Sequence, residues 1–130
     1  MMLVALLASL QAAAPTPVPP ANWDQLPALR WKLPPRRGVA TSRFVQDEVA
    51  AGRCGASQRS GGVALMTVHV AVLASADGRV RAVVPRAVNC PTVEQYTVGL
   101  IQRMALDNID MAGRTTETWY HAAMTYSWSG

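Results

Sequence analysis

The chain has 130 residues, enough for one domain and too few for two independent hydrophobic cores. Half of the residues are apolar and 15% are charged, which excludes a disordered charged tail. The net charge is only +4, and no basic run alternates with aromatic residues, so we expect no nucleic-acid partner. No apolar stretch exceeds the about 18 residues that a membrane span needs, so we expect no transmembrane helix.

An apolar run opens the chain. Residues 1–14 read MMLVALLASLQAAA, an apolar segment followed by three alanines. A short apolar core ahead of an Ala-x-Ala pattern is typical of a cleaved secretory signal peptide. The pattern predicts export to the periplasm, or association with the inner membrane if the signal is retained. A buried N-terminal helix of the domain is the alternative.

Export changes the expected role of Cys54 and Cys90, the two cysteines of the chain. Outside the cytosol an even pair of cysteines usually forms a disulfide, so we predict a Cys54–Cys90 bond. A redox-active pair is the alternative, but such pairs usually have Cys-x-x-Cys spacing. We expect no metal site, since His69 and His121 are the only histidines, and no cofactor.

Residues 15–38 contain seven of the nine prolines and are predicted to form an extended linker. Within it, Leu29–Leu33 alternates apolar and basic residues. This segment is expected to be a short strand on a sheet edge or an extended stretch packed on the domain. Trp23 and Trp31 are large apolar rings that we expect to dock on the domain.

The next segment is predicted to be a helix over residues 41–53. Thr41 or Ser42 supplies a capping hydroxyl, and Gly52 is a suitable stop. A polar, glycine-rich stretch follows Cys54 and is expected to be flexible.

Residues 63–73 alternate in polarity and are rich in β-branched side chains, which predicts a strand. Asp77-Gly78 is a strong hairpin signal, and residues 79–88 are predicted to return as the second strand. Because Pro85 has no N–H to donate, this strand should lie at an edge or end in a bulge. Its inward residues are expected to be Val80, Ala82 and Val84.

A helix is predicted over residues 91–106, with Pro91 at its first position. Cys90 stands where a capping Ser, Thr or Asp is usual, which favours another role for it, the disulfide. Thr92 and Gln95 are candidates for a capping box. The last strand is predicted over residues 118–128, with its apolar face formed by Tyr120, Ala122, Met124, Tyr126 and Trp128.

The predicted elements follow in the order helix, strand, strand, helix, strand, which indicates an α+β fold class. From Val63 to Trp128 the chain resembles the C-terminal domain of the TonB family. The shared parts, in order, are the VHVAVLASA strand, the Asp77–Val80 turn, the helix opening at Pro91 and an aromatic-rich closing strand, MTYSW. The resemblance implies a three-stranded antiparallel ββαβ sheet, preceded by a helix, with the first strand central and the helices packed on one face. It also implies that residues 39–130 form the TonB-like domain.

In the TonB family the last strand lies at a sheet edge and accepts an extended peptide from an outer-membrane receptor. The resemblance implies a periplasmic protein-binding domain, accessory to TonB-dependent outer-membrane transport, that binds a receptor or envelope-protein peptide by strand addition. The partner-binding residues would be Thr118, Trp119, Tyr120, His121, Ala122, Ala123, Met124, Thr125 and Tyr126.

Two alternatives concern the same edge. In the first, the Leu29–Leu33 segment of the same chain covers the edge. In the second, a second copy of the chain covers it, and the protein is then a disulfide-stabilised structural protein of the envelope that dimerises through sheet edges.

An enzyme requires a nucleophile with a base nearby, or two carboxylates in different environments. The eight acidic residues fall mostly in predicted turns and on exposed helix faces. His69 and His121 are predicted to be cross-strand neighbours whose pairing depends on pH, but they lack a third group. We therefore expect no catalytic residues.

Overall fold

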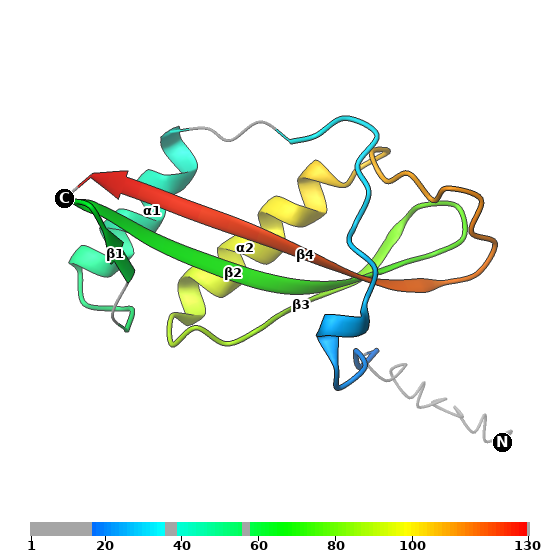
Figure 1. Cartoon of the computed structure of the whole chain (residues 1–130), viewed down its shortest axis with the longest axis horizontal. Helices are drawn as coiled ribbons and strands as arrows, with labels where there is room; N and C mark the ends of the chain where they lie inside the picture. Colours follow the sequence, from blue (N-terminus) through cyan, green and yellow to red (C-terminus); the bar gives the residue numbers. More distant parts are fainter. Residues whose placement is uncertain (1–16, 36–38, 56–57, 130) are drawn as a thin grey trace, which may run out of the picture.

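The computed structural model describes residues 17–35, 39–55 and 58–129; the predicted signal peptide, residues 1–14, lies outside the described residues. The fold is α+β, with one antiparallel sheet of four strands and two α-helices (Figure 1). Neither helix in the described part of the chain is long and apolar enough to cross a membrane. The elements in chain order are η1 (Trp23–Gln25, a 3-10 turn), α1 (Val39–Ala50), β1 (Gln58–Ser60), β2 (Val63–Ala74), β3 (Val80–Pro85), α2 (Pro91–Met104) and β4 (Thr118–Ser129).

β2 is the central strand of the sheet. It pairs with β4 over its whole length, from Val63 opposite Ser129 to Ala74 opposite Thr118. On its other side β2 pairs with β1 near its start and with β3 near its end. The predicted number of three strands is therefore wrong by one. The additional strand, β1, forms a hairpin with β2 through Gly61 and Gly62, whose positive φ angles of 57° and 80° suit a two-residue turn.

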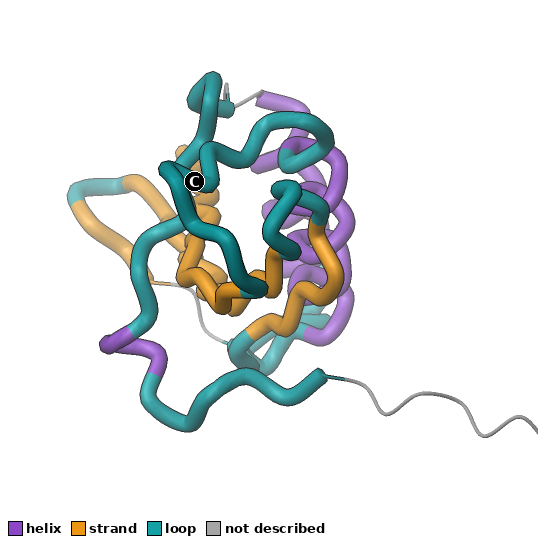
Figure 2. Tube along the Cα trace, turned by 90° about the vertical axis from the view of Figure 1, so that its right-hand side faces the viewer, coloured by secondary structure: helices purple, strands orange, loops and turns teal. Residues whose placement is uncertain are grey.

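The predicted alternation of β2 is confirmed. Met66, Val68, Val70 and Val72 are at most 8% exposed and belong to the hydrophobic core, together with Tyr120 and Tyr126 of β4. Figure 2 shows α1 and α2 on one side of the strands and η1 on the other. The helices therefore cover the face that carries the main core. The opposite face carries polar side chains such as Thr67 and His69, but it also buries Ala71 and Leu73, and the N-terminal segment lies on that side.

A buried polar contact anchors β4 to α2. The Thr97 hydroxyl donates to the carbonyl oxygen of Val93 at 2.8 Å, and lies 2.7 Å from the Tyr126 hydroxyl. Because the Thr97 proton is used within the helix, the Tyr126 hydroxyl is the donor between the two side chains. Burial raises the pKa of Tyr126, which keeps its hydroxyl protonated for this role.

β3 is an edge strand, as predicted, but it ends at Pro85 rather than continuing to residue 88, and the predicted set of inward residues is partly wrong. Ala74 pairs with Val80 whereas Leu73 pairs with Ala82, so the register shifts by one residue at Arg81. This bulge places Ala82 and Val84 on the sheet face away from the helices, while Val80 and Val83 pack against the core.

The helix α1 begins at Val39, two residues earlier than predicted, so Thr41 and Ser42 lie inside it rather than at its cap. Ser42 instead accepts a hydrogen bond from the Ser127 amide at 3.3 Å. The helix ends in a Schellman motif, in which Gly52 has φ +75° and its N–H donates to the Val49 carbonyl oxygen at 3.1 Å. The predicted stop at Gly52 is confirmed.

The predicted disulfide is present: Cys54 and Cys90 are bonded. The bond joins the segment after α1 to the residue that precedes α2, and Cys90 is fully buried. Cys90 offers no side-chain cap to α2, in agreement with the sequence argument.

The capping box predicted for Thr92 and Gln95 is wrong. The carboxylate of Glu94 accepts hydrogen bonds from the amides of Val88 and Cys90, at 3.2 and 3.1 Å. The Thr92 hydroxyl donates to Glu48 of α1 at 2.8 Å, so it joins the two helices beside the disulfide.

Candidate functional site: the outer edge of β4

The nine predicted partner-binding residues, Thr118–Tyr126, all lie in β4. Among the described strands, β4 pairs only with β2, so its other side is an edge of the sheet. The side chains of Tyr120, Ala122, Met124 and Tyr126 point toward the helices, as predicted. Trp119, His121, Ala123 and Thr125 therefore project from the opposite face.

A segment of the same chain crosses this edge. We call residues Pro27–Leu33 the strap. The His121 amide donates to the carbonyl oxygen of Pro27, and the Leu29 amide donates to the carbonyl oxygen of His121, both at 2.8 Å. These two bonds make a parallel bridge between Ala28 and His121. The strap thus adds to the edge of β4 as a very short extra strand.

The other side of the strap is bonded to the loop between α2 and β4. The Lys32 amide donates to the carbonyl oxygen of Asn108 at 2.8 Å, and the Asp110 amide donates to that of Arg30 at 2.9 Å. The side-chain amide of Asn108 bonds both the N–H and the C=O of Leu33, at 2.8 and 2.9 Å. The strap therefore lies in a channel with hydrogen-bonding backbone on both sides.

Side-chain burial holds the strap in this channel. Leu29 is 7% exposed and belongs to the core, and Trp31, which forms a bridge with Ile109, packs against it. The sequence left two alternatives for Leu29–Leu33, a short strand on a sheet edge or an extended stretch packed on the domain. The structure combines them, because the segment pairs with the edge of β4 at His121 and its later residues pack on the domain. No local sequence signal assigned Asn108 and Asp110 to this channel.

The strap covers only part of the β4 edge. Both backbone groups of His121 point away from β2, so by alternation those of Ala123, Thr125 and Ser127 do too. Backbone hydrogen bonds between the strap and β4 are confined, in the described ranges, to His121. The Ser127 amide reaches Ser42 of α1. In the part of the chain that the structure describes, the open part of the edge is therefore the short stretch centred on Ala123 and Thr125.

Beside this edge, the open sheet face carries two polar pairs. The hydroxyls of Thr67 and Thr125 are 2.9 Å apart, and Nδ1 of His69 lies 2.9 Å from Nε2 of His121. The two imidazoles are nearly parallel, with ring centroids 5.1 Å apart. The prediction that His69 and His121 are cross-strand neighbours is confirmed.

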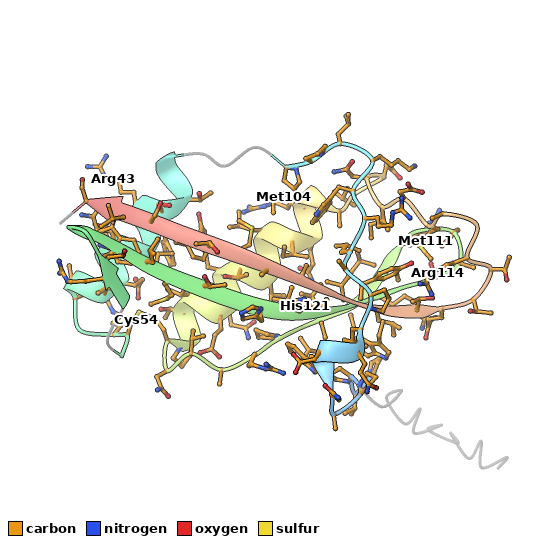
Figure 3. All side chains as sticks on the ribbon, viewed as in Figure 1. Arg43, Cys54, Met104, Met111, Arg114 and His121 are labelled. Atoms are coloured by element: carbon orange, nitrogen blue, oxygen red, sulfur yellow. A yellow bond between two sulfur atoms is a disulfide. The ribbon has the colours of Figure 1, made fainter. Side chains whose placement is uncertain are left out.

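His121 also faces the N-terminal segment (Figure 3). Burial lowers the pKa of His121, its electrostatic interactions with His69 and Arg86 lower it further, and its interaction with Asp24 opposes them. The Arg86 guanidinium lies 4.5 Å from the centroid of the Trp23 ring. Trp23 therefore docks over the end of β3. Because its pKa is lowered, His121 is neutral, and the two imidazoles share one hydrogen between Nδ1 of His69 and Nε2 of His121.

The arrangement is suited to backbone pairing. In the described part of the chain, no carboxylate hydrogen-bonds to either imidazole, and no three His, Cys, Asp or Glu residues gather to hold a metal ion. A groove of about 750 Å³ lies between the β2–β3 turn and the end of α2, but its lining includes no histidine.

A comparison with models of known protein families finds no match to this chain. Searches of curated proteins and of solved structures also find no match.

Proposed function

We propose that the chain is an exported, periplasmic protein-binding domain that accepts an extended peptide on the outer edge of β4. The observation that carries the proposal is that this edge already accepts an extended segment, the strap, through both backbone groups of His121. The Cys54–Cys90 bond is compatible with an oxidising compartment.

The peptide would add beyond the strap, next to Ala123 and Thr125. Backbone hydrogen bonds to these residues would supply affinity that depends little on sequence. Side chains of the added strand would lie beside Ala123, which is exposed, and beside the Thr67–Thr125 and His69–His121 pairs. This polar face favours a ligand with hydrogen-bonding side chains on that side.

The resemblance to TonB C-terminal domains suggests the source of the peptide. We propose a segment of an outer-membrane receptor or of another envelope protein, which would make this domain an accessory of TonB-dependent transport.

Replacing Ala123 with proline tests the proposal. The Ala123→Pro substitution removes one outward N–H but no ladder bond to β2, because that N–H points away from β2. With a photo-crosslinking residue at the exposed Ser127 position, the exported protein is crosslinked in its host. We expect the main crosslinked partner peptide to be lost by more than about tenfold.

Ala123→Val is the matched control, since it keeps the N–H and suits a strand; its crosslinking yield should stay within about twofold. Thermal melting must show that both variants are folded. Equal crosslinking by the proline and valine variants would contradict strand addition at this edge.

A further inference from the structure

The strap is bound to the domain as a separate peptide would be. Within the described residues, its backbone hydrogen bonds all reach residues far along the chain, namely His121, Asn108 and Asp110. The contact between Leu33 and Asn108, for example, spans 75 positions. Because these contacts do not depend on the strap's own chain neighbours, an identical segment from another molecule can make all of them.

The channel has clear chemical requirements. It buries an aliphatic side chain, Leu29, and two positions later it packs an aromatic ring, Trp31. The residues between and after them, Arg30 and Lys32, are exposed. The strap itself meets these requirements. A second copy of the chain carries the same segment, which points to a second copy as the partner.

The sequence that follows the strap favours release. Pro34 and Pro35 come directly after Leu33, and α1 begins at Val39. Consecutive prolines prefer an extended conformation, so Pro34 and Pro35 favour a chain that leads away from the channel rather than one that folds back into it.

Two leucines at this end of the channel are exposed to solvent. Leu33 is 75% exposed and Leu106 is 74% exposed. Both lie close to Asn108 in the structure: Leu33 is hydrogen-bonded to its side chain, and Leu106 precedes it by two positions. A second chain that passes through this region would cover apolar surface that one copy leaves in water.

We infer that the channel between β4 and Asn108–Asp110 also binds the Leu29–Leu33 segment of a second copy, so that two chains exchange straps and form a dimer. In the dimer each channel is filled by the partner, and no channel contact is lost. This inference uses the edge at His121, and it does not depend on peptide binding at Ala123.

Light scattering on the disulfide-bonded full chain, after size-exclusion chromatography, tests the exchange. The dimer fraction should rise with protein concentration from micromolar to millimolar. Leu29→Asp should weaken the dimer by more than about tenfold, because the variant monomer can leave its strap in water, whereas the exchanged dimer exists only with a carboxylate buried without a partner in both channels. Arg30→Ala changes an exposed side chain of the same strap and should leave dimerisation unchanged.

Absence of a dimer at every concentration would overturn the inference. A dimer that Leu29→Asp leaves intact would also overturn it, since that dimer would use another surface, such as the open part of the β4 edge. Mixing two differently tagged copies should yield a mixed dimer, and Leu29→Asp in both copies should abolish it.

A second measurement covers the case in which Leu29→Asp disturbs folding. The isotope-labelled Leu29→Asp protein, checked by circular dichroism, is titrated with a peptide of residues 26–34, LPALRWKLP. The amides of His121 and Asp110 should shift, and a peptide with aspartate in place of the leucine at position 29 should cause no shift. If the unmodified peptide causes none, the channel does not accept a strap from another molecule.

Discussion

Replacing Val70 with aspartate should unfold the domain. Val70 lies in the middle of the central strand β2, opposite Pro85 and Ala122, and its side chain is 0% exposed beneath the helices. A carboxylate placed there without a partner costs more than about 5 kcal/mol, which is comparable to the whole stability of a small domain. Circular dichroism and urea denaturation of the oxidised protein measure the effect.

Val63→Asp is the matched control for this substitution. Val63 lies in the same strand but is 37% exposed at its end, so the aspartate remains in contact with water. We expect a loss of no more than about 1 kcal/mol. If the Val70 variant melts like the wild type, the assignment of the inner face of β2 is wrong.

Removing the disulfide should give the second-largest effect. The bond between Cys54 and Cys90 closes a loop with a sequence separation of 36. The chain-entropy description of such a loop gives a loss of about 4 kcal/mol when the bond is removed. Urea denaturation of the Cys54→Ala/Cys90→Ala variant should show this loss.

Reduction provides the internal control. A reducing agent should lower the stability of the wild type toward that of the double variant and leave the double variant unchanged. Thiol titration of the oxidised, denatured wild type should find no free thiol. Two titratable thiols, or equal stability of the two proteins, would contradict the role given to this bond.

Patterns that depend on near neighbours were predictable. The period-two alternation from Met66 to Val72 identifies a strand because one face of it must be buried. Asp77-Gly78 predicts the turn because Gly78 adopts φ +82°, a conformation that favours glycine. Cys90 in a capping position favoured a disulfide, since a cysteine caps poorly.

Features set by distant contacts were not predictable. The strap reads as a proline-rich linker because nothing within residues 15–38 reveals that His121 and Asn108 bind it. The bulge at Arg81 depends on how β3 meets β2, and it reverses the predicted faces of Ala82 and Val84. The strand β1 has three residues, and it exists only because β2 offers an edge to pair with.

The candidate site combines both kinds of information. The alternation of residues 118–128 predicted which side chains of β4 face the helices. Together with the alternation of residues 63–73, it also placed His69 and His121 on the same sheet face as cross-strand neighbours. How much of the edge is open could not be predicted, because it depends on where the strap crosses.

Amide hydrogen exchange along β4 in the free protein tests the central claim most directly. The His121 amide is bonded to Pro27 of the strap, and the Ala122 amide points toward β2, so both should exchange slowly. The Ala123 amide points outward from the open edge and should exchange at least about 100-fold faster than either neighbour. An Ala123 amide as slow as those of His121 and Ala122 would show that this edge is covered, and would contradict its role in accepting a partner strand.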